Sequence, residues 1–480
     1  MGKMEERPPA RAAHMSGQLS SGTIIVEADA DAPDLARRLA SLLTLPGVEH
    51  ELLLIACLEE NLAIAASVLA SDFPPLRIVT LSSEQPDTHG ARLFDQVRTE
   101  RVAFLSADAS VTPPQWSELA DSSSSLMFWV PDIPIPQHSA RDYPINGRCW
   151  LASTDLLRNL DGLGSVNNWS LLHVARVAES HQRTVRWHSP HNFSSTRPRE
   201  TPDNDSHVME RDSPVLAVVP HYHCEEWLGQ CLSSLLAQTE PLAGIVVVDD
   251  HSAEPPVEVL REFPQVTLLL AAENVGPYRL VQEVINRTDY DAYLFQDADD
   301  WSACDRLEIL LDEAARTGAE LIGSQELRVL AETEEVVPVC YPLDVSRALA
   351  EHEGHPLLHP TSLISRGLVQ RSGGFSTALR FGGDTEMLLR VGLAARVANV
   401  ARYCYFHRHR AASLTTSAET GLESPARVAL RASIKEWAER HRPLRARGDW
   451  AKLSPYAVAG PVSLTHVLGP RLRLSAGHSI

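Results

Sequence analysis

Several classes of protein are excluded by what this chain of 480 residues has little of. Basic residues are scarce, and the net charge of −19 argues against nucleic acid or an anionic membrane as the main partner. The seven cysteines are scattered without a C-x-x-C pair, which disfavours a disulfide framework or a structural zinc site and favours a reducing cytosol. No stretch approaches the ~18 apolar residues of a membrane-spanning helix, so no integral membrane segment is predicted.

Two nucleotide-binding signatures are also missing. No G-x-G-x-x-G follows a predicted strand, which argues against a dinucleotide-binding dehydrogenase. The turn after Val219 has neither Gly nor Lys nor Arg, whereas a nucleotidyltransferase would carry a Gly-rich, basic loop there. The first residues are charged and have no apolar h-region, so they are not a signal peptide. Residues 1–20 are therefore predicted to be a disordered tail.

The rest of the composition is that of a globular protein, with 44% hydrophobic and 22% charged residues. Strand-like and helix-like segments alternate over residues 21–188 and again over 214–420, which predicts two α/β domains, each with a mostly parallel sheet. Residues 189–213, rich in Pro, Ser, Asn and Asp, are predicted to be a linker. Residues 421–480 are predicted to form a helix and a loosely structured tail.

An acidic cluster, Asp297-Ala298-Asp299-Asp300, follows a short apolar strand and precedes a helical pattern. Open α/β sheets bind ligands at the carboxyl ends of their strands, and carboxylates two residues apart can converge on Mg²⁺ or Mn²⁺. The alternative is that Asp300 or Ser302 only caps a helix starting near Ala303.

The two halves resemble each other. Gly90-Ala-Arg92 and Val102-Ala-Phe-Leu-Ser-Ala-Asp108 parallel Gly276-Pro-Tyr-Arg279 and Ala292-Tyr-Leu-Phe-Gln-Asp-Ala-Asp299. In this alignment Ser106 stands opposite Asp297, Asn168 opposite Asp384, and Asp108 alone keeps its acid. A fold kept while most of its acids are lost predicts a duplicated, non-catalytic first copy, although two unrelated α/β domains would give similar low-information patterns.

An ordered set of motifs in the second half resembles glycosyltransferase family 2, whose fold is named GT-A. The matching pieces are Val218-Val-Pro-His-Tyr222, Cys231-Leu-Ser-Ser-Leu-Leu-Ala-Gln-Thr239, Ile245-Val-Val-Val-Asp-Asp-His-Ser252, Asn274-Val-Gly-Pro-Tyr-Arg279, Gln296-Asp-Ala-Asp-Asp-Trp301, and Gly373-Gly-Phe375 with Gly383-Asp-Thr-Glu386. The resemblance covers about residues 213–416. It implies tandem GT-A-like domains, the first degenerate and the second catalytic.

The resemblance also implies roles for individual residues. The catalytic base would be Asp384, with Glu386 as the alternative, although acids at a helix N-terminus also have a purely structural explanation. The metal ligands for Mn²⁺ or Mg²⁺ would come from Asp299, Asp297, His407 and His409. The residues that would bind the nucleotide sugar are Pro220, Tyr222, Asp249, Asp250, Gly276, Arg279, Asp297, Ala298, Arg408 and Arg410.

Two positions depart from the family pattern. Arg410 stands where many members have a His, and an arginine can pair with a diphosphate but cannot ligate a metal. His223 stands where the family often has Asn after Tyr. The third metal ligand and one contact to the base are therefore open.

The sequence thus predicts a cytoplasmic, inverting, metal-dependent glycosyltransferase that uses a nucleotide-sugar donor, by family default a UDP-sugar. The acceptor is unknown and could be a glycan, a peptide or a small molecule. A non-catalytic scaffold built from two degenerate copies is the main alternative. A nucleotidyltransferase is the other.

Overall fold

The structure is a computed structural model. It describes residues 209–478 except 333–335, 352–354, 412 and 418–419, and from the earlier part only the strands and two further residues, Leu93 and Val97. The chain divides into two compact units, Met1–Ser125 with Cys149–Trp169, and Leu126–Arg148 with Ser170–Ile480. The predicted tail 1–20 and most of the predicted linker 189–213 lie outside the described residues. The predicted domain boundaries stay predictions.

The first sheet has seven strands in the order β3-β2-β1-β4-β7-β5-β8. Their bounds are β1 Gly22–Ala28, β2 Glu51–Cys57, β3 Leu76–Leu81, β4 Arg101–Leu105, β5 Leu126–Trp129, β7 Cys149–Ser153 and β8 Val185–His188. The strands β1, β2, β3 and β4 run parallel, β7 runs antiparallel to β4, and β5 is parallel to β8. Strand β1 buries Thr23 to Val26 completely, as expected of a strand covered on both faces.

The second sheet follows the order β13-β17-β14-β16-β12-β9-β10-β11-β18, and β15 pairs with β14 and with the short strand β6 (Arg141–Asp142). Its strands are β9 Val215–His221, β10 Gly244–Asp249, β11 Thr267–Ala271, β12 Ala292–Phe295, β13 Trp301–Ser302, β14 Leu321–Leu330, β15 Val336–Cys340, β16 Leu363–Ser365, β17 Val397–His409 and β18 Leu464–Leu468. The central strands β12, β9, β10 and β11 are parallel, which confirms the predicted α/β class.

The two sheets share one plan. Strands β1, β2, β3, β4, β5, β7 and β8 take the same places, in the same chain order, as β9, β10, β11, β12, β14, β16 and β17. In both sheets the first four of these strands are parallel and the next neighbour, β7 or β16, is antiparallel. The shared order supports the predicted duplication, because unrelated α/β domains have many other orders available. The aligned residues Ser106, Asp108 and Asn168 lie outside the described residues.

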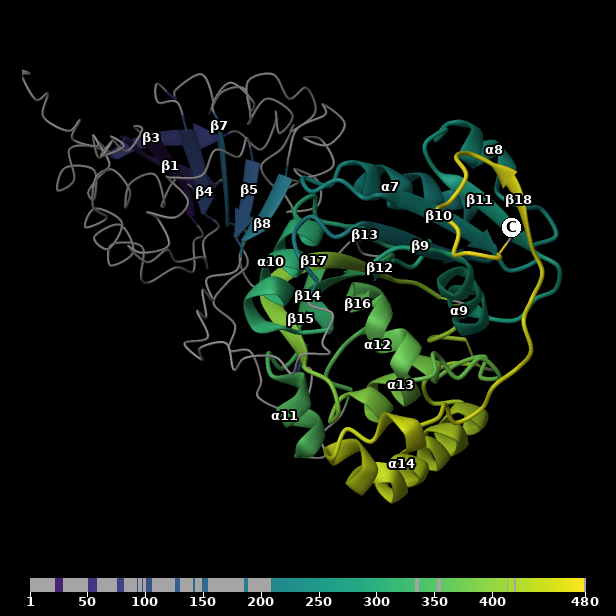
Figure 1. Ribbon diagram of the computed structural model, residues 1–480. Coiled ribbons are helices and arrows are strands. Elements are labelled where there is room, and N and C mark those ends of the chain that lie inside the picture. Colours follow the sequence, from purple (N-terminus) through teal and green to yellow (C-terminus); the bar gives the residue numbers. More distant parts are fainter. Residues whose placement is uncertain are drawn as a thin grey trace, which may run out of the picture. The chain divides into compact units, whose positions relative to one another are not determined.

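Helices cover both faces of the second sheet, as Figure 1 shows for α7 on one side and α9, α12 and α13 on the other. The helices are α7 Glu225–Leu236, α8 Val257–Arg261, α9 Pro277–Arg287, α10 Arg306–Thr317, α11 Val345–Ala350, α12 Arg366–Arg371, α13 Gly383–Val391 and α14 Pro425–Ala446. None of the described helices is long and apolar enough to cross a membrane. Helix α10 begins at Arg306, three residues later than predicted, and its N-cap residue Asp305 makes no side-chain cap bond.

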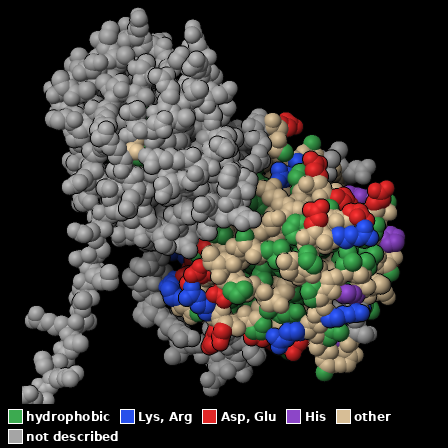
Figure 2. All heavy atoms as spheres, turned by 90° about the horizontal axis from the view of Figure 1, so that it is seen from above, with side chains coloured by type: hydrophobic (Ala, Val, Ile, Leu, Met, Phe, Trp, Pro, Cys, Tyr) green, Lys and Arg blue, Asp and Glu red, His purple; other side chains and the backbone are tan. Residues whose placement is uncertain are grey.

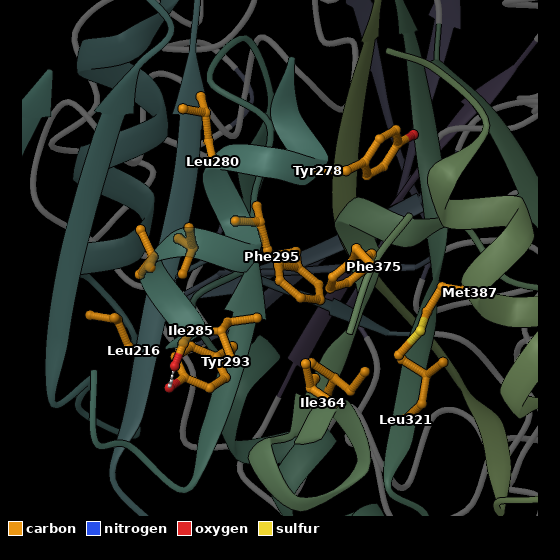
Figure 3. Close-up of a cluster of buried hydrophobic side chains, with 14 of the residues drawn as sticks. Leu216, Tyr278, Leu280, Ile285, Tyr293, Phe295, Leu321, Ile364, Phe375 and Met387 are labelled. Carbon is orange, nitrogen blue, oxygen red and sulfur yellow. Dashed lines mark hydrogen bonds between the residues drawn. The ribbon is translucent and has the colours of Figure 1, made fainter. Parts of the chain in front are cut away.

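Alternate residues of β9 enter two separate cores. Val215, Ala217 and Val219 pack toward α7 and α10, whereas Leu216 and Val218 pack toward α9. This alternation follows from the two-residue period of a strand. Figure 3 shows the second core, in which the Phe295 and Phe375 rings lie close together beneath Tyr278. The strand that leads to the acidic cluster is thereby fixed from both sides.

The C-terminal segment is more ordered than predicted, because residues 464–468 form β18, an antiparallel edge strand beside β11. Figure 1 shows this segment, in yellow, returning along α9 to the sheet edge. Arg279 donates to the carbonyls of Gly460 and Pro461, and Arg287 donates to that of Val462. The missed signal was weak, since an edge strand needs only one partner and no apolar run.

Candidate active site

Polar side chains gather where the parallel strands of the second sheet end. Strand β9 ends at His221, β10 at Asp249 and β12 at Phe295, two residues before Asp297. Because neighbouring parallel strands have their carboxyl ends at the same edge, the motifs predicted from sequence meet there. Figure 2 shows that one face of this unit mixes acidic, basic and apolar side chains.

Asp300 anchors the acidic turn, residues 297–300, to strand β17. One oxygen of its carboxylate accepts a hydrogen bond from the Tyr405 hydroxyl at 2.8 Å, and the other accepts one from the Arg408 backbone N–H at 2.7 Å. The Asp297 backbone N–H donates to the same hydroxyl at 3.2 Å. Burial, far more than the nearby charges, raises the pKa of Asp300 well above its usual range. Asp300 therefore ties the turn to β17 and does not cap the helix.

A buried arginine supports the strand that leads into the turn. Arg306 donates to the side-chain oxygens of Gln296 and Ser302 and to the backbone carbonyls of Phe295 and Pro360. Desolvation lowers its pKa to about 10, which still leaves the guanidinium charged at neutral pH. No motif singled out Arg306, because its partners are scattered along the sequence.

Two carboxylates of the acidic turn, those of Asp297 and Asp299, differ in environment. The side chain of Asp297 is exposed. Desolvation by the neighbouring protein, and after it the negative charge of Asp299, raise the pKa of Asp297 to about 7. Asp299 is less than one fifth exposed, and its Oδ2 lies 2.8 Å from Nε of Arg410. Ala298 between them is buried. Within the described part of the chain, no three carboxylate, imidazole or thiol groups converge as a ready metal site.

Basic side chains at the end of β17 lie near this turn. Nδ1 of His407 lies 3.1 Å from a carboxylate oxygen of Glu326; burial alone would lower the pKa of His407, but Glu326 and Asp300 outweigh it and raise it to about 10. Arg408 donates to the Asp299 carbonyl at 3.0 Å and to Gln230 at 2.8 Å. His409 is exposed. The predicted role of His407 as a metal ligand stays a prediction.

Asp249 and Asp250 form another part of this sheet edge. Asp249 lies 2.9 Å from Nδ1 of the buried His221 and accepts the Ser252 backbone N–H at 2.9 Å. Burial opposes ionisation of Asp249, but these partners outweigh it and lower its pKa.

Asp250 accepts the backbone N–H groups of Val275 and Gly276 at 2.7 and 2.8 Å, while burial raises its pKa. Gly276 has a φ of +85°, which only glycine adopts readily, directly before α9. Pro220 and the exposed Tyr222 surround His221 at the end of β9. The structure therefore gathers these predicted residues, but Arg279 points instead to the C-terminal segment.

Asp384, the predicted base, lies in the first turn of α13. Its Oδ1 accepts the Tyr278 hydroxyl at 2.9 Å, and its Oδ2 lies 3.9 Å from Nε2 of His355. Burial would raise the pKa of Asp384, but His355, His359 and the hydrogen bonds together lower it. The negative charge of Asp384 in turn raises the pKa of Asp297, so the two carboxylates share one electrostatic environment.

A small enclosed cavity lies beside Asp384. It is lined by Phe295, Leu321, Leu357, His359, Ile364, Phe375, Asp384, Met387 and Leu388. Burial lowers the pKa of His359 to about 4, so this imidazole is neutral at pH 7. Phe295 and Asp384 line the same cavity, which places the base candidate directly beyond the end of β12.

Glu386 has a different environment. Its oxygens are held by Arg390 at 2.7 Å and by the Ser376 hydroxyl at 2.8 Å, and the Glu386–Arg390 pair is fully buried. A buried carboxylate with these partners is occupied in a structural ion pair. Asp384 and Glu386 lie only two residues apart at the start of one helix, so the sequence pattern does not distinguish the outward side chain from the buried one.

Acids therefore follow the ends of β10 and β12, beside the buried His221 at the end of β9. Residues 216–338 match the model of the family described as glycosyl transferase family 2. This match confirms the resemblance to that family which the motifs predict.

Among curated proteins, the glycosyltransferase GlyA of Streptococcus pneumoniae serotype 4 is 30% identical over 113 residues, which cover 23% of this chain and 16% of that protein. The chain thus spans about a sixth of the length of this relative. Two solved structures of TarS from S. aureus are similar at low scores. The complex with UDP has a TM-score of 0.36 and 18% identity, covering 48% of this chain and 72% of TarS 1-349. The complex with UDP-GlcNAc has a TM-score of 0.36 and 17% identity, covering 50% and 75%.

Proposed function

We propose that the second unit is an inverting glycosyltransferase that moves a sugar from a UDP-sugar to an acceptor hydroxyl, with Mn²⁺ or Mg²⁺ as its cofactor. The observation that carries this proposal is that Asp384 lines a cavity with Phe295, which ends β12 two residues before Asp297, and that the charge of Asp384 acts on Asp297. An in-line displacement needs a base on one side of the anomeric carbon and a stabilised leaving group on the other. The family 2 match supports the same reaction class.

The donor would lie along the edge from Asp250 to Asp299. Asp249 is held ionised by His221 and Ser252, and a carboxylate so placed can accept hydrogen bonds from a base or ribose. The exposed Tyr222 next to it offers a ring face for the base. The tight turn at Gly276 lets the chain pass close to Asp250.

Asp297 and Asp299 fit a divalent cation on one observation. They lie two residues apart on the same turn, and the negative charge of Asp299 adds to the effect of burial in raising the pKa of Asp297 to about 7; a hard cation is what such a pair of oxygens neutralises. When bound, Mn²⁺ or Mg²⁺ would supply positive charge to the leaving diphosphate. Asp299 and Asp297 would hold it, with Arg408 beside them.

Asp384 would remove the proton from the attacking hydroxyl. Its lowered pKa keeps it ionised at neutral pH, and the Tyr278 hydrogen bond fixes one oxygen so that the other can face the acceptor. The hydroxyl oxygen forms the new bond to the anomeric carbon while the bond to the diphosphate oxygen breaks, which inverts the carbon. We assign this role to Asp384 and not to Glu386, because both oxygens of Glu386 are committed to buried partners.

The acceptor would be a glycan, a peptide or a small molecule, and the reaction would take place in a reducing cytosol. The described cysteines Cys224, Cys231, Cys340 and Cys404 are not in disulfides, which is consistent with that compartment.

Hydrolysis of a panel of nucleotide sugars, with and without Mn²⁺ or Mg²⁺, tests the proposal. We expect slow, metal-dependent release of nucleotide from one donor, lost in Asp299→Ala and kept in Asp108→Ala. Anomer-resolved NMR of the released sugar would then show inversion. If no donor turns over and UDP with Mn²⁺ does not bind in calorimetry, the domain is a non-catalytic scaffold and the proposal is wrong.

A further inference from the structure

Arg410 occupies the carboxylate that the proposed function assigns to the metal ion. Its Nε lies 2.8 Å from Oδ2 of Asp299, with both side chains less than one fifth exposed. Its guanidinium also lies 4.3 Å from the centre of the Trp227 ring and donates to Sγ of Cys224 at 3.6 Å. Contacts on an acid, an aromatic face and a thiol hold the guanidinium in one place, as a stacked and paired arginine requires.

The neighbouring side chains of β17 are engaged elsewhere. His407 faces Glu326, and Arg408 reaches past the carboxylate to the Asp299 carbonyl and Gln230. His409 is exposed. Arg410, in contrast, pairs with a carboxylate of the acidic turn, that of Asp299. Arg410 stands where the family pattern has a histidine that could bind the metal. The residue at this position is here a cation that competes with the metal for Asp299.

Two cations cannot approach one carboxylate oxygen without repelling each other at close range. A guanidinium has a geometry that matches phosphate oxygens, so the diphosphate of a bound donor offers Arg410 a second partner. Resting on the function proposed above, we infer that Arg410 is an exchangeable cation. It neutralises Asp299 in the free enzyme and turns to the donor diphosphate when the metal–nucleotide complex binds.

This role has a signature that a structural role lacks. Removing the charge of Arg410 frees Asp299 for the metal but deprives the diphosphate of a partner. Binding of metal alone should therefore become tighter while binding of metal-free nucleotide becomes weaker. A substitution that only loosened the fold would weaken both.

Isothermal titration of the full chain with Mn²⁺ alone, and separately with UDP in EDTA, measures the affinity for the metal and the affinity for the metal-free nucleotide. For Arg410→Gln we expect roughly fivefold tighter Mn²⁺ binding, since a partly buried ion pair contributes little more than an exposed one. We expect about tenfold weaker UDP binding from loss of a charge-assisted contact. Electron paramagnetic resonance of free Mn²⁺ measures the Mn²⁺ affinity by a method that does not depend on the heat of binding.

Two further variants keep the test decisive. Arg410→Lys keeps the charge and should hold UDP affinity within about threefold of wild type, even if Arg410→Gln proves unstable. Arg402→Gln is the matched control, because Arg402 lies on the same strand and pairs with Asp305 at 3.6 Å, away from the turn. It should change neither affinity.

Unchanged or weaker Mn²⁺ binding in Arg410→Gln, or unchanged UDP binding, would overturn the inference. The proposed function would survive that result if wild type binds UDP. Absence of UDP binding to wild type, with or without Mn²⁺, would instead count against the proposed function itself.

Discussion

The two sheets of this protein have the same strand order but different residues at their carboxyl edges. If Phe104 and Phe295, which the repeat aligns, are taken as equivalent, the strand pairings make Ala28 equivalent to His221 and Ala56 to Asp249. A hydrogen-bonded His–Asp pair at the nucleotide edge of one sheet thus corresponds to two alanines in the other. Backbone hydrogen bonds and apolar burial preserve the fold, whereas the edge chemistry is carried by side chains that the fold does not need.

The largest effect should come from replacing the proposed catalytic base of the second copy by the residue that the first copy has at the aligned position. Asn168 stands opposite Asp384 in the repeat, so Asp384→Asn introduces the residue of the first copy. We expect kcat to fall about 10²- to 10⁴-fold, the usual contribution of a general base. Steady-state assays with the donor found in the hydrolysis panel would measure it, with UDP affinity unchanged.

Glu386→Gln gives the contrast for that test. It leaves the buried Arg390 without its partner, and breaking such a pair costs about 3 kcal/mol or more of unfolding free energy. Chemical denaturation should show this loss for Glu386→Gln and little change for Asp384→Asn. The opposite pattern would exchange the roles of the two acids.

The next effect concerns the nucleotide edge. The double variant His221→Ala/Asp249→Ala copies Ala28 and Ala56 into the second sheet. UDP affinity should fall about 10- to 100-fold, because a charged hydrogen-bonding group is removed from the edge. Calorimetry with UDP and Mn²⁺ measures the loss. Wild-type affinity in a folded double variant would mean that the two edges differ for another reason.

A smaller effect is expected from Tyr278, which has no counterpart because Gly90-Ala-Arg92 is one residue shorter than Gly276-Pro-Tyr-Arg279. Tyr278→Phe removes the hydrogen bond that helps to lower the pKa of Asp384. Activity needs the ionised base and is lost as pH falls through its pKa, so the acid limb of the pH–rate profile should move to higher pH. We also expect kcat to fall roughly threefold to tenfold, since the carboxylate is less well oriented.

Tyr293→Phe is the matched control for this experiment. Tyr293 is also buried, and its hydroxyl bonds to Thr288, on the opposite side of the core from the site. Removing the Tyr293 hydroxyl should leave the acid limb of the pH–rate profile unchanged. An unmoved limb in Tyr278→Phe as well would show that Asp384 does not set that limb.

The smallest effect should come from a residue type that both copies keep. Arg279, like Arg92, follows the glycine of its motif, and it binds the carbonyls of Gly460 and Pro461. Arg279→Ala should lower the free energy of unfolding by about 1 kcal/mol and leave the KM for the donor unchanged. A raised KM would return Arg279 to the nucleotide site where the sequence pattern placed it.

The acidic turn illustrates how far sequence reasoning reached. The spacing of Asp297 and Asp299 after an apolar strand placed them at a strand end, because a strand and the turn that follows it are adjacent in the chain. Asp300 was ambiguous, since its partners Tyr405 and Arg408 lie more than a hundred residues away. His355 and Glu326 were not identified as neighbours of the site for the same reason.

The sequence by itself determined the α/β class, the order of the motifs and the acids at the strand ends, because these depend on local periodicity and on neighbours in the chain. Only the tertiary structure decided which charges meet. It paired Arg410 with Asp299, His407 with Glu326, Tyr278 with Asp384 and Arg390 with Glu386. Three of these four pairs join residues from distant segments, and all four depend on side-chain direction and burial, which set the strength of an electrostatic interaction and have no fixed sequence spacing.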